Sequence, residues 1–213
     1  MADHISPIDT PASASVNDLA FLRSLAEAGR DAPLSAGPYL VFGGGWFAVA
    51  SIVIGLADLA LIPFTRNEVM PACMLGALVG FGITLAVLVR RDARKAETNT
   101  NKAVGAAWTA AGFGIFFYFL AIQIASWRTG SGDLHHTMLL VVLLLYGTAW
   151  LVMAQVTGRR WMVGVALLTA ISLFGVAFSL ATQAAWLAYA GALILSGVLP
   201  GAYLMHLART ARG

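Results

Sequence analysis

The chain has few charged residues for its length. Only 11% of its 213 residues are charged, whereas 59% are hydrophobic, and the mean hydropathy is +0.80. A soluble domain carries about 25% charged residues, so this chain has too few to cover a globular surface in contact with water. The composition therefore excludes an ordinary soluble domain and predicts a membrane protein.

Cysteine and catalytic motifs are also scarce. Cys73 is the single cysteine, which excludes an intrachain disulfide and a metal site built from several cysteines. The sequence contains no glycine-rich phosphate loop and no HExxH motif. Its basic residues do not follow a groove-sized face, which argues against nucleic-acid binding. We therefore expect no enzymatic activity, no cofactor and no nucleic-acid partner.

Six apolar segments have the length of a membrane span. A span needs about 20 residues at a rise of 1.5 Å per residue, and inside hydrocarbon the backbone must satisfy its own hydrogen bonds. The sequence therefore predicts an all-α, polytopic bundle of six transmembrane helices over residues 38–206. The predicted spans are Tyr39–Phe64, Met70–Val89, Ala103–Trp127, Thr137–Val156, Trp161–Leu180 and Ala184–Met205.

The basic residues alternate between the connections that join these spans. If the N-terminus is cytoplasmic, eleven of the 13 Lys and Arg residues (all except Arg66 and Arg128) fall on the cytoplasmic side. Basic residues near helix ends resist translocation. We therefore predict a multi-pass protein of the bacterial inner membrane with both termini cytoplasmic. Residues 1–16 are expected to form a disordered tail, and residues 207–213 a second cytoplasmic tail.

A short amphipathic helix and linker are predicted at residues 17–37, ahead of the first span. Within Asn17–Arg30, the apolar residues Phe21, Leu22 and Leu25 lie on adjoining faces, with charged residues opposite. Such a helix either lies on the inner membrane surface or docks a cytoplasmic protein. The basic loop after the second span is on the same side, so both are candidate contacts for anionic lipid, a cytoplasmic partner or a larger membrane complex. The basic residues concerned are Arg90, Arg91, Arg94 and Lys95.

One polar pair is a candidate transport site. Asp58 is the acidic residue predicted inside a span, near its outer edge, and Gln123 lies at similar depth on the third span. Ionisable residues within membrane segments often mark substrate or ion pathways, and Pro200 is expected to kink the sixth span. One hypothesis is therefore a small transporter or channel. The alternative is that Asp58 only pairs with Arg66 or Arg128 near the interface.

Soft metal ligands gather at the outer ends of the second and fourth spans. Met70, Cys73 and Met74 share one helix face, and His135 and His136 begin the fourth span. Thioether, thiolate and imidazole groups suit copper, and imidazole also binds haem iron. A further hypothesis is therefore an outward-facing metal or haem site. The alternative is that these methionines pack in the bundle and the histidines cap a helix.

The N-terminal layout resembles a known group of proteins. Asn17–Gly55 (NDLAFLRSLAEAGRDAPLSAGPYLVFGGGWFAVASIVIG) combines the amphipathic helix, the segment Leu34–Gly37 and a first span rich in small residues. In this it is similar to a loose group of uncharacterised bacterial inner-membrane proteins, some encoded beside winged-helix regulators. That resemblance implies a membrane partner in a signalling pair and carries no assigned activity. The first hypothesis is therefore a non-enzymatic structural or regulatory membrane subunit.

Overall fold

The computed structural model describes residues 34–92, 98–130 and 134–211, and within these ranges it contains helices and no strands. Six helical stretches are long and apolar enough to cross a membrane, which confirms the all-α, polytopic fold. The elements are α2 (Gly37–Asp58), α3 (Arg66–Asp92), α4 (Asn99–Thr129), α5 (His135–Thr157), α6 (Trp161–Ser179), α7 (Ala185–Leu193), the π-helical turn η1 (Ile194–Val198) and α8 (Leu199–Thr210).

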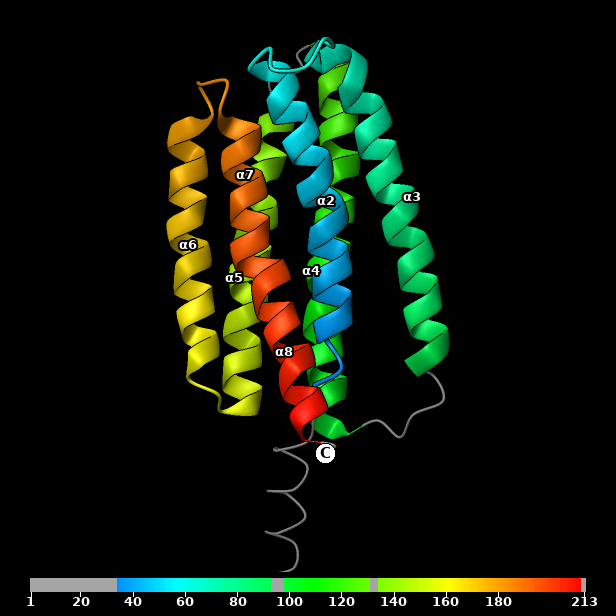
Figure 1. The fold of residues 1–213 in the computed structure, drawn as a ribbon, viewed down its shortest axis with the longest axis vertical. Helices are drawn as coiled ribbons and strands as arrows, with labels where there is room; N and C mark the ends of the chain where they lie inside the picture. Colours follow the sequence, from blue (N-terminus) through cyan, green and yellow to red (C-terminus); the bar gives the residue numbers. More distant parts are fainter. Residues whose placement is uncertain (1–33, 93–97, 131–133, 212–213) are drawn as a thin grey trace, which may run out of the picture.

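The helices run alternately up and down and pack in a definite order (Figure 1). α2 packs against α3 on one side and against α7, η1 and α8 on the other, while α5 packs between α4 and α6. α6 contacts α7 and so joins the two groups. α3 and α4 lie at the two ends of this packing order, and both expose most of their surface. Their outward apolar side chains, among them Leu75, Ile83, Phe113 and Phe117, form a surface suited to lipid.

The two ends of the bundle differ in charge. At the lower end in Figure 1, α2, α4 and α6 begin and α3, α5 and α8 finish. We call this the basic end, and the opposite end the distal end. Among the described residues, Arg66 and Arg128 are the basic residues at the distal end. The described basic residues at the basic end are Arg90, Arg91, Lys102, Arg159, Arg160 and Arg209.

The first span ends earlier than its sequence predicts. α2 stops at Asp58, although apolar residues continue to Phe64. The N–H of Ala60 bonds the carbonyl of Ala57 at 3.0 Å, and the N–H of Leu61 bonds that of Leu56 at 2.9 Å. This is a Schellman pattern with Ala60 in the left-handed region, at φ 52°. The motif satisfies the last carbonyls of α2 and leaves residues 59–65 as a loop, which places Asp58 at a helix end.

Close backbone approach joins α2 to α8 in the interior. A Cβ added to Gly201 would lie 2.8 Å from the Cβ of Leu40 and 2.9 Å from the carbonyl oxygen of Gly37. One turn away, a Cβ on Gly197 would lie 3.7 Å from the Cα of Gly44. Small residues of this kind allow helices to pack closely in a membrane. Gly197 and Gly201 of the sixth span therefore allow close packing between helices of the same chain.

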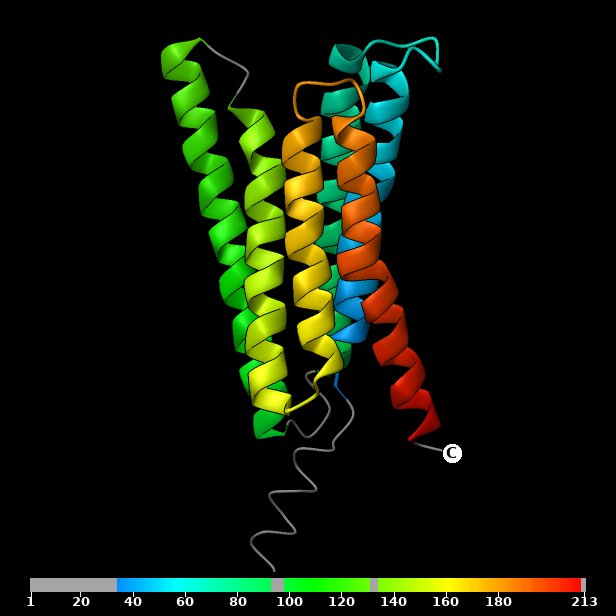
Figure 2. The same ribbon diagram turned by 90° about the vertical axis from the view of Figure 1, so that its left-hand side faces the viewer.

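The sixth span is interrupted before Pro200. α7 passes into the π-helical turn η1, and α8 then continues in a different direction (Figure 2). π-Turns and prolines are recognised causes of helix bending. The bend expected from Pro200 is therefore present, and α8 runs on to Thr210, past the predicted boundary at His206.

Candidate functional site

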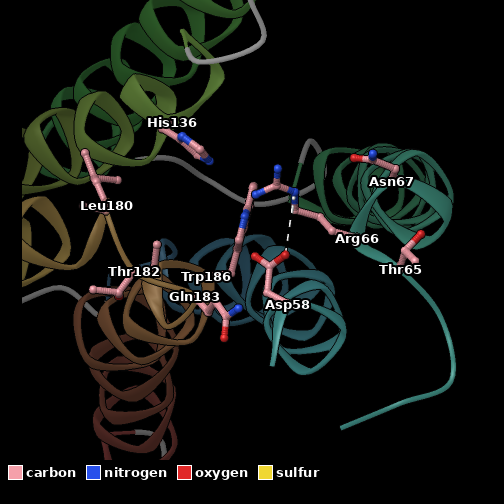
Figure 3. A pocket seen from close by; sticks show the side chains of 11 residues that line it. Asp58, Thr65, Arg66, Asn67, His136, Leu180, Thr182, Gln183 and Trp186 are labelled. Carbon is pink, nitrogen blue, oxygen red and sulfur yellow. Dashed lines mark ion pairs between the residues drawn. The ribbon is translucent and has the colours of Figure 1, made fainter. Parts of the chain in front are cut away.

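A hollow of about 450 Å³ lies at the distal end of the bundle. It is formed by the end of α2, the start of α3, the start of α5 and the connection between α6 and α7 (Figure 3). We call it the distal hollow. It is lined by Asp58, Thr65, Arg66, Asn67, His136, Leu180, Ala181, Thr182, Gln183, Ala185 and Trp186.

An ion pair lies at the wall of the distal hollow. The Nε atom of Arg66 lies 3.7 Å from Oδ1 of Asp58, and the two side chains are 43% and 13% exposed. Charge-assisted hydrogen bonds between nitrogen and oxygen are usually about 2.7–2.9 Å long. The pair is therefore electrostatic and loosely held, and it leaves other nitrogens of the guanidinium able to meet a second oxygen acceptor.

Both charges of this pair oppose the dipole of their own helix. Asp58 is the last residue of α2, where the helix dipole is negative, and Arg66 is the first residue of α3, where it is positive. Glu68 supplies one half of a capping box at the start of α3, because its carboxylate accepts from the N–H and the hydroxyl of Thr65 at 2.7 and 2.9 Å. Glu68 complements the dipole, whereas Arg66 does not. Helix stability alone does not account for the placement of either member of the pair.

Trp186 lines the same hollow and carries a buried donor. It is the second residue of α7 and is only 4% exposed. Its Nε1 has no hydrogen-bond acceptor among the described residues. An indole nitrogen can only donate, and a buried donor without an acceptor costs about 1–3 kcal/mol. Figure 3 shows the indole edge-on, and Trp186 lines the hollow together with Asp58, Arg66 and His136.

Other tryptophans in the bundle do find acceptors. Trp46 donates to Oγ1 of Thr84 at 3.2 Å, and Trp108 contacts the sulfur of Met153 at 2.9 Å. Trp150 donates to a backbone carbonyl at 2.7 Å. The unpaired nitrogen of Trp186 therefore departs from the pattern set by these three indoles.

The adjacent histidines of α5 face different surroundings. His136 lines the distal hollow. His135 instead lies against α4, with Nε2 3.3 Å from Oε1 of Gln123 and Nδ1 3.5 Å from Oγ of Ser126. Neighbouring residues of a helix point about 100° apart, so His136 faces the hollow while His135 faces α4.

The predicted transport pair is not brought together. Asp58 pairs with Arg66 and lines the distal hollow, whereas Gln123 is exposed on α4 and contacts His135. Of the two basic partners expected for Asp58, the structure pairs it with Arg66.

The soft-ligand residues are likewise divided. Met70, Cys73 and Met74 are partly buried and pack against the apolar cluster that includes Leu139 and Val142. Of the two histidines, His136 lines the distal hollow and His135 lies against α4. Among the described residues, no group of three or more His, Cys, Asp or Glu side chains is arranged to share a metal ion. The arrangement therefore places these methionines and the cysteine in apolar packing.

The predicted partner surface is described only in part. Arg90 and Arg91 lie in the last turn of α3, where cations complement the helix dipole. The remaining candidates lie outside the described residues, namely Phe21, Leu22, Leu25, Arg94 and Lys95.

The sequence pointed to Asp58 and His136 but not to Trp186. The burial of Trp186 arises from contacts between helices that are distant in sequence, and no local pattern marks it. The position of Arg66 did have a signal, because Thr65 and Glu68 have the spacing of a capping box and so identify a helix start. Arg66 directly follows the capping residue, which puts its charge at the unfavourable end of the helix dipole.

Comparison of the chain with protein-family models, with curated proteins and with solved structures found no match in any of the three. Its function must therefore be inferred from the chemistry of the distal hollow.

Proposed function

We propose that this integral membrane protein is a non-enzymatic regulatory component that binds a small polar ligand in the distal hollow. The observation behind the proposal is the buried Nε1 of Trp186, which has no acceptor among the described residues and belongs to a residue that lines the same hollow as a loosely held ion pair. A ligand with an oxygen acceptor would satisfy this donor. Binding would then offset a desolvation cost of about 1–3 kcal/mol that the protein otherwise bears.

The cost of the ion pair's position supports the same conclusion. Asp58 and Arg66 each oppose a helix dipole, an effect of about 0.3–1 kcal/mol per charge at exposed positions. Residues that break a local rule without a structural gain are often functional. Asp58 and Arg66 gain only a loose partner in each other at 3.7 Å, and the buried Trp186 donor gains none among the described residues; all three residues line the distal hollow.

The proposed orientation places the distal hollow on the outer side of a bacterial inner membrane. The described Lys and Arg residues favour the basic end six to two, and basic helix ends tend to remain cytoplasmic. A ligand from outside would then be sensed by a bundle whose basic end faces the cytoplasm. There, the amphipathic segment predicted before α2 and a protein partner would receive the signal.

Binding is tested with purified full-length protein in neutral detergent. Glycine, acetate, methylammonium and inorganic phosphate are added separately at millimolar concentration, and the thermal unfolding temperature and tryptophan fluorescence are recorded. We expect at least one probe to raise the unfolding temperature of the wild type and to do so less in Trp186→Phe. If neither these probes nor the lipid vesicles described in the next subsection change either measurement, the proposed function is wrong.

Orientation is tested with single cysteines in a Cys73→Ser background. Thr182→Cys lies at the distal hollow, and Arg159→Cys lies at the basic end. A membrane-impermeant maleimide added to intact cells should label the first and not the second. The reverse pattern would place the distal hollow in the cytoplasm and contradict the proposed orientation.

A further inference from the structure

The distal hollow is lined by one negative charge, one positive charge and a tryptophan whose buried Nε1 has no acceptor among the described residues. We propose that its ligand is a small zwitterion, with an ammonium group that binds Asp58 and an oxyanion that binds Arg66 and the indole N–H of Trp186. This inference rests on the proposed function and specifies its ligand. The chemistry is that of a free amino acid or of a phosphoethanolamine headgroup.

The charge balance of the site favours a zwitterion over a simple ion. Asp58 and Arg66 compensate each other across 3.7 Å, so the pair is neutral as a whole. An anion bound to the terminal nitrogens of Arg66 would bring a second negative charge beside the 13% exposed carboxylate of Asp58, and an uncompensated charge in a sheltered place is costly. A cation that takes Asp58 would leave Trp186 Nε1 without an acceptor. A zwitterion supplies both charges, so Asp58 and Arg66 each meet an opposite charge and the indole N–H gains an acceptor.

The donors in the site fit an oxyanion. A guanidinium presents five N–H groups in a planar fork, which suits carboxylate and phosphate oxygens. Nε is the guanidinium atom that meets Asp58, at 3.7 Å, so the terminal nitrogens can turn to a second partner. The Trp186 indole adds a buried donor, and the residue is packed in the apolar cluster that includes Tyr189 and Leu193.

The remaining lining residues fit a small polar molecule. His136, Thr182 and Gln183 place polar groups around the opening, while Leu180 and Ala185 give apolar surface. The volume of about 450 Å³ lies within the range of about 300–1,000 Å³ that is usual for small-ligand sites. A short side chain or a glycerol linkage would therefore fit beside the charged groups.

The ligand class has two sources at this depth, and the experiment separates them. The hollow lies at the end of the spanning helices, where both dissolved amino acids and lipid headgroups are present. One arm therefore compares glycine with its two halves, acetate and methylammonium, in detergent. The other arm compares vesicles of phosphatidylethanolamine with vesicles of phosphatidylglycerol, whose headgroup has no ammonium.

The readouts are the unfolding temperature and the apparent dissociation constant from tryptophan fluorescence. We expect glycine to bind at least tenfold more tightly than acetate or methylammonium, and Asp58→Asn and Arg66→Gln each to weaken it at least tenfold. Trp186→Phe should weaken it severalfold while retaining ring packing. Trp127→Phe, at an 83% exposed position on α4, is the matched control and should change nothing.

Each other outcome is decisive. Acetate as effective as glycine would overturn the zwitterion and leave the proposed binding function intact. No response to any probe or vesicle would overturn both. A response to phosphatidylethanolamine vesicles alone, lost in Asp58→Asn and Trp186→Phe, would support the zwitterion with a headgroup as its source. If Asp58→Asn fails to fold, Trp186→Phe and Arg66→Gln carry the test.

Discussion

Trp150 donates a hydrogen bond of 2.7 Å from its indole nitrogen to the backbone carbonyl of Ser196. In a regular α-helix this carbonyl would accept from residue 200, but Pro200 has no N–H. Trp150 is fully buried, at 0% exposure, and belongs to α5, whereas Ser196 lies in the π-helical turn η1. A side chain from another helix therefore supplies a donor where the proline removes one.

Trp150→Phe should destabilise the bundle because it leaves the Ser196 carbonyl buried without this donor. A loss of about 1–3 kcal/mol is expected for an unsatisfied buried group. Pro200→Ala restores a backbone N–H, so the same tryptophan substitution should cost less in that background. Thermal or denaturant unfolding of the four proteins of this double-mutant cycle measures the coupling. Equal costs in both backgrounds would show that Trp150 acts through packing alone.

Gly201→Ala should also destabilise the fold. The added Cβ would lie 2.8 Å from Leu40 and 2.9 Å from the backbone oxygen of Gly37, so the helices must separate. Overpacking of this kind costs about 1–3 kcal/mol. Gly112→Ala on α4 is the matched control, because nothing lies within 4 Å of its added Cβ. Unfolding measurements should show a loss for the first and none for the second.

Ala60→Gly should stabilise the end of α2. Ala60 adopts φ 52°, a left-handed conformation that costs an L-residue about 1–2 kcal/mol. Part of that gain is offset because glycine loses more conformational freedom on folding. Gly158, at φ 69° after α5, gives the opposite test, since Gly158→Ala should destabilise. A stabilising Gly158→Ala or a destabilising Ala60→Gly, measured by thermal unfolding, would contradict this interpretation of the two helix ends.

The number and nature of the helices followed from the sequence because they depend on local properties. Twenty apolar residues in a row must bond their own backbone in hydrocarbon, whatever they pack against. The end of the first span was misplaced because Leu59–Phe64 is as apolar as a helix interior. The chain turns there through the left-handed conformation of Ala60, and alanine gives no advance sign of it.

The distal hollow depends on properties that are not local. The sequence identified Asp58 and named Arg66 as one of two partners, since only two basic residues were expected on that side. The sequence linked Asp58 to Gln123 only because both were expected at similar depth in the membrane. Residues at equal depth on different helices can face different neighbours. Trp186 escaped notice because its importance comes from a missing acceptor, which only the packed structure reveals.

The basic end should retain anionic lipid, and Arg90 and Arg91 allow a direct test. A basic residue near an acidic membrane surface contributes about 1 kcal/mol, so removal of two should lower retention severalfold or more. Purified protein from mixed phosphatidylglycerol and phosphatidylcholine bilayers is analysed by native mass spectrometry. Arg90→Gln with Arg91→Gln should lose phosphatidylglycerol relative to the wild type, while Arg128→Gln, at the distal end, should not. High salt should reduce the difference, because at 1 M the screening length falls to about 3 Å and weakens the attraction between exposed arginines and acidic headgroups. Equal retention in all three proteins at low salt would mean that these arginines set orientation without holding lipid.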